Sequence, residues 1–186
     1  MKTTLISLNG YACTGKDTAA SIVQSMVPEF ENKKFADKLK QIASIMTGLP
    51  AIHFEDRDLK ESQLSEDWGM TAREFLQKLG TDAIRTHLHN NAWVNALMSD
   101  YRAPKLSEYN PSKWIITDVR FPNEAQAIKE RGGVVVRINR PGFGPVNGHQ
   151  SETAMDGWDF DYILDNDGDM YRLKQKVENF LLWLKN

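Results

Sequence analysis

The chain has 186 residues, enough for one domain with a sizeable core, and its apolar and charged fractions of 41% and 26% are those of an ordinary globular protein. The net charge of −2 gives no electrostatic reason to expect a nucleic acid or a membrane surface as the main partner. A single cysteine excludes an intrachain disulfide, no stretch approaches the roughly 20 apolar residues of a membrane span, and residues 1–8 are too short and polar for a signal peptide, so we expect a cytoplasmic protein.

The first element is an apolar strand over Leu5–Leu8, followed by the pattern Gly-x-x-x-x-Gly-Lys and then by a helical pattern over Asp17–Val27. This strand, loop and helix order predicts a phosphate-binding loop, in which successive N–H groups and the positive end of the helix face phosphate oxygens. We expect Lys16 to follow the charge of the phosphoryl group in transit. The predicted ATP-binding residues of the loop are Gly10, Ala12, Cys13, Thr14, Gly15, Lys16, Asp17 and Thr18.

The loop departs from the usual pattern at one position. A Ser or Thr that holds Mg²⁺ usually follows the lysine, but here Asp17 follows it and Thr18 comes one residue later. The spacing Gly-Lys-x-Thr is typical of nucleoside monophosphate kinases. The sequence leaves open whether Asp17 or Thr18 contacts the metal, and we take Thr18 as the candidate ligand.

The middle of the chain predicts mainly helices. A short strand over Lys33–Ala36 precedes a helix that ends at Gly48, and the charged residues 51–69 lack a clear period, which suggests a mobile insertion. Thr71 and Glu74 form a capping-box pattern before a helical stripe that reaches Leu88 and is expected to break near Gly80. A further helix is expected over Ala92–Met98.

The last third alternates strands and helices. The expected elements are a buried strand over Trp114–Thr117, a helix over Pro122–Arg131, a strand over Val134–Ile138, a short strand over Tyr162–Leu164 and a closing helix over Leu173–Leu184. Residues 139–150 contain three glycines and two prolines, so we expect a mobile lid. This alternation predicts a single doubly wound α/β domain over 1–186, with a mostly parallel sheet and the site at the carboxyl ends of its strands.

Charged residues mark these strand ends. Asp118 ends the buried strand, where a phosphate-loop protein keeps the acid that holds Mg²⁺, and Arg120 follows it. Arg137 and Arg140 flank the end of the next strand, and arginine forks stabilise the charge of phosphoryl transfer. Asn166, after the last short strand, could line an adenine pocket. The alternative for Asp118 is a structural ion pair, and each arginine could equally be a solvated surface residue.

Several motifs together resemble the deoxynucleoside monophosphate kinases of tailed bacteriophages. The matching segments are Leu5–Thr18, Phe35–Lys40, Thr71–Glu74, Leu79–Asp82 with Arg85, Trp93–Val94, Thr117–Glu124, His149–Glu152 and Asn166–Gly168. The resemblance implies a three-layer α/β/α P-loop fold of the nucleoside monophosphate kinase type, an ATP donor with Mg²⁺, and a deoxynucleoside 5′-monophosphate acceptor. By the same analogy, the acceptor side comprises Asp37, Lys38, Arg73, Arg85 and Trp93.

The sequence therefore predicts an ATP-dependent kinase that converts a deoxynucleoside monophosphate to the diphosphate, with Lys16, Asp118, Arg120, Arg137 and Arg140 as catalytic residues and Thr18 and Asp118 on the metal. The expected partners are small nucleotides, with no membrane and no main role for nucleic acid; a homodimer is compatible with the sequence, and a viral protein would act in the host cytoplasm. Two alternatives stay open. One is a P-loop kinase acting on a hydroxymethylated base in phage DNA, and the other is a nucleotide-binding regulator without transfer chemistry.

Overall fold

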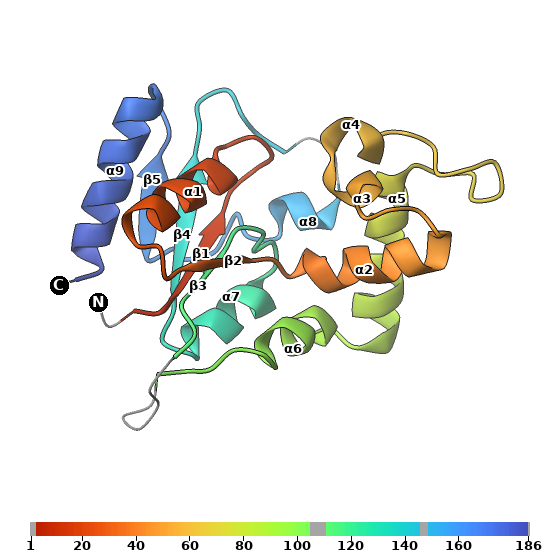
Figure 1. Ribbon diagram of the computed structural model, residues 1–186, viewed down its shortest axis with the longest axis horizontal. Coiled ribbons are helices and arrows are strands. Elements are labelled where there is room, and N and C mark those ends of the chain that lie inside the picture. Colours follow the sequence, from red (N-terminus) through yellow and green to blue (C-terminus); the bar gives the residue numbers. More distant parts are fainter. Residues whose placement is uncertain (1–2, 105–110, 146–148, 186) are drawn as a thin grey trace. The chain divides into compact units, whose positions relative to one another are not determined.

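The computed structural model describes residues 3–104, 111–145 and 149–185 of the chain (Figure 1). The strands are β1 (Leu5–Asn9), β2 (Glu31–Lys33), β3 (Trp114–Ile116), β4 (Val134–Asn139) and β5 (Tyr162–Asp165). The helices are α1 (Lys16–Met26), α2 (Ala36–Thr47), α3 (Ile52–Glu55), α4 (Arg57–Lys60), α5 (Ala72–Gln77), the π-helix η1 (Lys78–Leu88), α6 (Ala92–Met98), α7 (Pro122–Lys129), α8 (Gln150–Thr153) and α9 (Met170–Trp183).

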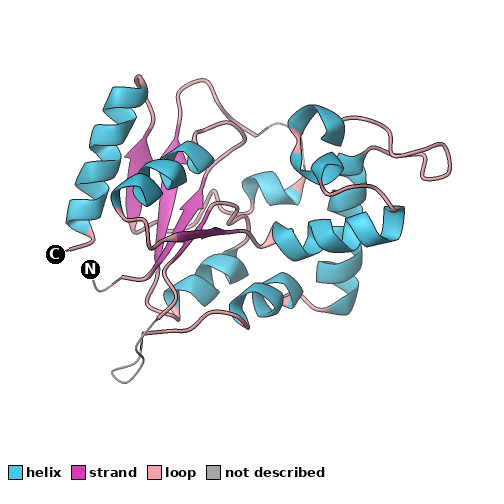
Figure 2. Ribbon diagram, in the orientation of Figure 1, coloured by secondary structure: helices cyan, strands magenta, loops and turns pink. Residues whose placement is uncertain are grey.

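The chain divides into two compact units. Unit 1 comprises Met1–Lys34 and Tyr101–Asn186, and unit 2 comprises Phe35–Asp100. All five strands belong to unit 1, whereas unit 2 is helical (Figure 2). The single domain predicted over 1–186 is thus divided into two compact units. That the two units fold together as one domain stays a prediction.

The sheet of unit 1 is parallel throughout and has the order β2-β3-β1-β4-β5. β1 lies at its centre with every residue buried, as expected for a strand covered on both faces. The strands that follow β1 in the chain lie on both sides of it, because β3 pairs with one edge of β1 and β4 pairs with the other. The carboxyl end of β1 is therefore a topological switch point, the place where open α/β sheets bind ligands.

Side chains alternate between the two faces of this sheet. Ile6 and Leu8 of β1 pack with Val23 of α1 and Phe180 of α9 in one apolar core. The intervening Ser7 lies on the other face, because successive strand residues point to opposite sides; α7 contacts β1 and β4. The sheet therefore has helices on both faces, in three layers, which confirms the predicted α/β fold with a central parallel sheet.

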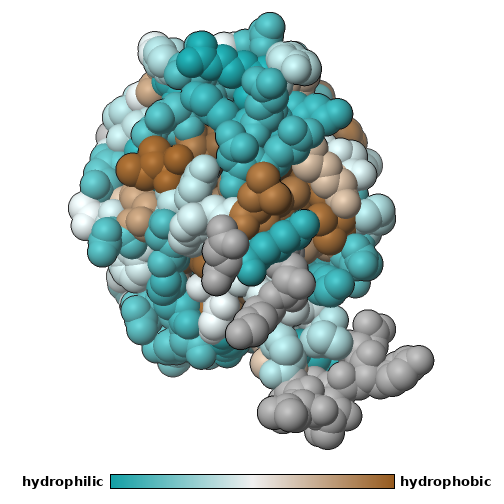
Figure 3. Space-filling view, turned by 90° about the vertical axis from the view of Figure 1, so that its left-hand side faces the viewer, coloured by the Kyte–Doolittle hydropathy of each residue, from teal (hydrophilic) through white to brown (hydrophobic). Residues whose placement is uncertain are grey.

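Figure 3 shows one side of the molecule, on which hydrophobic residues are interspersed with hydrophilic ones. The exposed apolar side chains of β5 and α9 are Ile163, Met170, Tyr171, Leu182 and Trp183. Among the described residues, no helix combines the length and apolarity needed to cross a bilayer. The compatibility with a homodimer stays a prediction.

Unit 2 has its own small core. Ala43, Phe54, Ala72 and Phe75 form its buried cluster, with Trp68 packed edge-on against Phe75. Phe54 belongs to the segment 51–69, whose first half folds into the two short helices α3 and α4, and its ring is fully buried. The sequence shows no period there because each helix is only one turn long; the mobility of this segment stays a prediction.

The helix that begins at the predicted Thr71–Glu74 capping box does not break at Gly80. From Lys78 onward it widens into η1, as the bond from the His89 N–H to the Ile84 carbonyl over five residues shows. A Cβ at Gly80 would lie 2.6 Å from Leu39, so this glycine allows α2 to approach η1 closely. The glycine therefore marks a helix contact, where the sequence suggested an interruption.

Candidate active site

The predicted phosphate loop connects the carboxyl end of β1 to the first turn of α1, which begins at Lys16. Its backbone turns through positive φ angles at Gly10 (153°), Cys13 (61°) and Gly15 (102°). A side chain at Gly10 would lie 2.6 Å from the Ile138 carbonyl oxygen of β4, so only glycine fits there. The buried Thr14 hydroxyl donates to the Tyr11 carbonyl at 3.0 Å and closes the loop from inside. The loop thus directs the N-terminus of α1 toward the switch point, which suits an anion.

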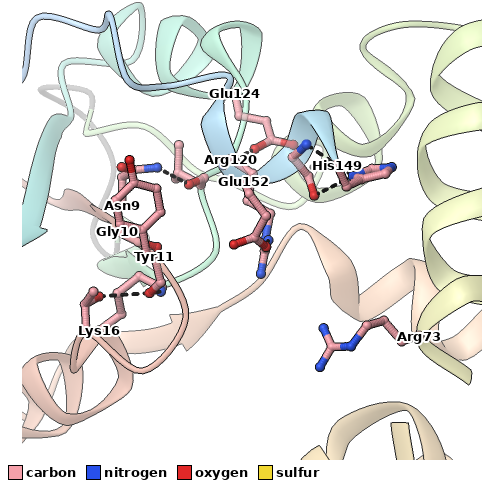
Figure 4. A network of polar contacts seen from close by, with 12 residues as sticks. Asn9, Gly10, Tyr11, Lys16, Arg73, Arg120, Glu124, His149 and Glu152 are labelled. Carbon is pink, nitrogen blue, oxygen red and sulfur yellow. Dashed lines mark hydrogen bonds and ion pairs between the residues drawn. The ribbon is translucent and has the colours of Figure 1, made fainter. Parts of the chain in front are cut away.

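Lys16 lies inside this turn. Its Nζ donates to the carbonyl oxygens of Gly10 at 2.7 Å and Tyr11 at 2.6 Å (Figure 4). Burial, and after it the positive charge of Arg120, lower the pKa of Lys16 to about 8, although the charges of Asp17, Glu152 and Asp118 act in the opposite direction. These opposing effects show that both signs of charge meet at Lys16, as a site for phosphoryl transfer needs.

Asp17 is tied to the residues that directly follow two strands of the sheet, β2 and β3. Its Oδ1 accepts a hydrogen bond from the Thr117 hydroxyl at 3.0 Å and lies 3.1 Å from Lys34 Nζ. Partial burial by itself would raise the pKa of Asp17, but the bond and charge of Lys34 and the bond from Thr117 hold it below its usual value. The carboxylate is therefore ionised at neutral pH and anchors the first turn of α1.

Asp118 and Arg120 follow β3, where the sequence predicted them. Arg120 Nη1 donates to Glu152 Oε1 of α8 at 2.8 Å, and the two side chains lie together in Figure 4. Glu124 accepts from the backbone N–H groups of Arg120 and Phe121 at 2.8 and 3.1 Å, which fixes the turn into α7. Asn9 Nδ2, at the end of β1, donates to the Val119 carbonyl at 2.7 Å, so Asp118 and Arg120 on either side of Val119 lie next to the strand end from which the loop of Lys16 starts.

Arg137, at the end of β4, is engaged on several sides. Its Nη1 donates to Asn9 Oδ1 at 2.6 Å and its Nη2 lies 3.4 Å from Asp156 Oδ1. The guanidinium also lies over the rings of Tyr11, at 4.5 Å, and Phe160, at 5.6 Å. Its predicted catalytic role is untested, and its contacts are those of a residue that supports the loop.

Arg140 and Asn166 contact the loop at neighbouring carbonyl groups. Arg140 Nη1 donates to the Cys13 carbonyl at 3.1 Å, and Asn166 Nδ2 donates to the Thr14 carbonyl at 2.9 Å. Arg140 is the second residue of the predicted lid over 139–150, of which 146–148 lie outside the described residues, and α8 begins at the last position of the lid. Both residues thus contact the predicted phosphate loop, and their roles toward ATP stay predictions.

The five predicted acceptor residues all belong to unit 2. Asp37 and Lys38 lie in the first turn of α2, and Arg73 Nε pairs with Glu61 at 2.5 Å. Arg85 is buried and donates to the Asn90 carbonyl at 3.1 Å, and Trp93 is buried with its indole N–H on the Gly80 carbonyl at 2.8 Å. Trp93 is thus a core residue of this unit, and an aromatic residue at helical spacing is at least as often a core residue as a ligand contact.

The predicted Mg²⁺ site is assessed from the side-chain groups that could bind the ion. No group of three or more His, Cys, Asp or Glu that could hold an ion occurs among the residues that the structure describes. Mg²⁺ does not require one, because it keeps several waters and uses one or two carboxylates together with substrate phosphates. The Asp118 carboxylate and Thr18 hydroxyl provide the hard oxygen donors that this ion prefers, so they fit it. Asp17 Oδ1 pairs with Lys34 and accepts from Thr117, and Thr18 stays the predicted ligand.

Sequence reasoning missed the residues that hold the predicted ones. These are Asn9, Tyr11, Lys34, Thr117, Glu152 and Asp156. Asn9, Tyr11, Thr117 and Glu152 lie in segments of the resemblance, Leu5–Thr18, Thr117–Glu124 and His149–Glu152, but nothing in the sequence indicated their bonds. Lys34 and Asp156 lie outside those segments, and their partners Asp17 and Arg137 are more than 15 residues away along the chain.

Comparison with known proteins gives consistent results. The sequence profile of the family described as deoxynucleotide monophosphate kinase matches residues 50–177, more than half of the chain. A protein of Acanthamoeba polyphaga mimivirus, whose name assigns it provisionally to the deoxynucleotide monophosphate kinases, is 36% identical over 160 residues, which cover 81% of each protein. The deoxynucleotide monophosphate kinases of Enterobacteria phage T4 and Escherichia phage RB69 are 29% and 24% identical over 120 residues. These residues cover 64% of this chain but only 48% of each phage enzyme, so the match spans about half of their length. The profile match and the mimivirus relative together show that the chain belongs to the deoxynucleotide monophosphate kinase family, as its resemblance predicted.

Proposed function

We propose that this kinase transfers the γ-phosphoryl group of ATP to a deoxynucleoside 5′-monophosphate and so forms the diphosphate. The observation that carries the proposal is the grouping of Lys16, Asp118 and Arg120 around a glycine-shaped loop at the switch point of a parallel sheet. Membership of the deoxynucleotide monophosphate kinase family supports the choice of acceptor.

The residues divide into three roles in this proposal. Loop N–H groups and the start of α1 bind the donor phosphates, and the ammonium group of Lys16 moves from the loop carbonyls to the phosphoryl group in transit. Arg120 stabilises the charge that develops on the equatorial oxygens. No carboxylate base is needed, because the acceptor phosphate is already an anion.

Thr18 and Asp118 would hold Mg²⁺, which when bound neutralises charge on the donor phosphates. Asp118→Asn tests this role directly. We expect turnover to fall about 100-fold and the Mg²⁺ concentration for half-maximal activity to rise, with little change in the melting temperature. Calorimetric titration of Mg²⁺ into the complex with ATP gives a readout other than activity. A variant that melts many degrees lower yet keeps its activity would instead make Asp118 part of a structural ion pair.

The acceptor groups come from unit 2 in this proposal, with Arg73 as the strongest candidate. Its half-buried guanidinium pairs with Glu61 and can grip two oxygens of a monophosphate. Asp37 and Lys38, at the start of α2, are further candidates for the nucleoside.

One experiment separates this function from its alternatives. The protein is incubated with γ-labelled ATP, Mg²⁺ and a panel of the deoxynucleoside monophosphates, normal DNA and DNA that carries a hydroxymethylated base, with Lys16→Ala as the inactive control. We expect label in deoxynucleoside diphosphates and none in DNA. Label in the modified DNA supports the DNA-base kinase, and ATP binding without any transfer supports the regulator.

A further inference from the structure

Two acidic residues of the short stretch Gln150–Asp156 bond residues of the candidate active site. Glu152 lies in α8, and its side chain is only 8% exposed while its Oε1 accepts from Arg120 Nη1 at 2.8 Å. Asp156 follows four residues later, and its Oδ1 accepts the Tyr11 hydroxyl at 2.8 Å. The stretch Gln150–Asp156 therefore touches both the arginine after β3 and the phosphate loop.

Further bonds close this arrangement into a ring. The Asp156 carboxylate also pairs with Arg137, which donates to Asn9 Oδ1 at 2.6 Å. Asn9 in turn donates through Nδ2 to the Val119 carbonyl at 2.7 Å, next to Arg120 in the chain. The ends of β1, β3 and β4 are thus linked to the stretch that includes α8, and each link joins residues far apart in sequence.

The contacts of Arg137 define its place in the ring. Its side chain is 12% exposed, its two terminal nitrogens have partners, and aromatic rings lie against its guanidinium. Releasing it to a phosphate would leave Asp156 and Asn9 without their cation. Arg137 is therefore better suited to hold the loop through Tyr11 than to contact the reacting atoms.

We propose that the stretch Gln150–Asp156 is a brace for phosphoryl transfer, in which Glu152 positions Arg120 and Asp156 positions the phosphate loop through Tyr11 and Arg137. The kinetic part of this inference rests on the proposed function. The charge of Glu152 also offsets that of Arg120 at Lys16, so both lie within electrostatic reach of the lysine. Glu152, Asp156 and Arg137 are positioning residues in this scheme, and Arg120 is the catalytic residue.

The first test concerns Glu152. Glu152→Gln keeps the size of the side chain and removes its charge; we expect kcat to fall about tenfold or more while the ATP dissociation constant stays within about twofold, because a mispositioned arginine acts on the transition state. A double variant, Arg120→Gln with Glu152→Gln, should be no slower than Arg120→Gln alone, since Glu152 acts through Arg120. Multiplying effects, or an unchanged kcat in Glu152→Gln, would overturn this part.

The matched control is Lys129→Gln, which removes the ion pair of Lys129 with Asp161 in the same unit. It should leave kcat unchanged. If circular dichroism shows that Glu152→Gln does not fold, Glu152→Asp replaces it, with a retained charge, a shorter reach and the same expected loss of kcat.

The second test concerns the loop and needs no acceptor. Tyr11→Phe removes only the hydroxyl that donates to Asp156 and keeps the ring over Arg137, and Asp156→Asn removes the charge. We expect each to raise the ATP dissociation constant about three- to tenfold in calorimetric titrations. Unchanged affinity in both variants overturns this part. If the wild type binds ATP but phosphorylates no deoxynucleotide, the proposed function fails. The brace is then still tested by these ATP affinities and by the rate at which Glu152→Gln hydrolyses ATP with water, compared with the wild type.

Discussion

The two units hold their polar side chains in different ways. Around the phosphate loop of unit 1, bonds join distant parts of the chain, such as Asn9 to Val119 and Arg120 to Glu152. In unit 2 two of the predicted functional side chains bond locally, Arg73 to Glu61 and Arg85 to Asn90, and an apolar cluster forms the core.

This difference bears on what each unit has to do. A polyphosphate donor is the same in every turnover, so a cross-linked loop that is fixed before binding avoids reorganisation during the reaction. The Arg73 and Glu61 pair of unit 2 can exchange partners at little cost, because exposed ion pairs contribute only about 0–1 kcal/mol. We therefore expect substitutions in unit 1 to alter turnover and those at Arg73 to alter acceptor affinity alone.

Lys16→Ala should show the largest effect in unit 1. Removing the ammonium group that accompanies the phosphoryl group should lower kcat by about 1,000-fold or more, because electrostatic stabilisation dominates this chemistry. The melting temperature should barely change, since Nζ bonds only two loop carbonyls. Lys113→Ala, which removes an ion pair with Glu29 in the same unit, serves as the control. Near-normal turnover in a folded Lys16→Ala protein would remove the lysine from the mechanism.

Arg73→Ala tests the other side of the comparison. We expect the KM for the acceptor to rise about tenfold or more, because a charged hydrogen-bond partner of the phosphate is lost, with the ATP dissociation constant unchanged. Steady-state kinetics with varied acceptor and calorimetry with ATP measure the two quantities. Arg57→Ala, at an exposed arginine of α4, is the matched control. A loss of ATP affinity in Arg73→Ala would mean that the two units do not divide the work as proposed.

The same contrast explains what the sequence could predict. The loop, Asp118 and the buried strands follow from local patterns, because a glycine turn and an apolar run are dictated by neighbouring residues. Tyr11, Asp156 and Lys34 could not be found this way, since their roles depend on which strand ends meet in space. The short helices α3, α4 and α8 were missed because a single turn has no periodicity. Trp93, placed on the acceptor side by the resemblance, is buried, and its spacing in the sequence cannot tell a core aromatic from one that contacts a ligand.

The pH dependence of ATP binding sharpens the role of Lys16. Burial lowers the pKa of Lys16 to about 8, so the free protein loses this charge as the pH rises through 8. A bound polyphosphate favours the protonated form, and binding above pH 8 then requires proton uptake. We expect the ATP affinity to be constant below about pH 7 and to fall about tenfold between pH 8 and 9.5. Lys16→Arg keeps its charge throughout and should show a flat profile; parallel profiles in both proteins would assign the titration to another group.

Arg140→Ala should have the smallest effect, because this exposed arginine adds one bond to the loop at the Cys13 carbonyl and lies over the Phe143 ring at 4.6 Å. We expect kcat to fall about three- to tenfold, and more than the KM for ATP rises, since its contact would form mainly in the closed, reacting state. Hydrogen exchange over 139–145 should slow when a bisubstrate analogue binds. Arg131→Ala is the matched control, because Arg131 also donates to a backbone carbonyl, that of Ala127, in the same unit. Equal exchange with and without the analogue, together with an unchanged kcat, would leave Arg140 as a support of the loop backbone and place the catalytic charge of unit 1 on Lys16 and Arg120 alone.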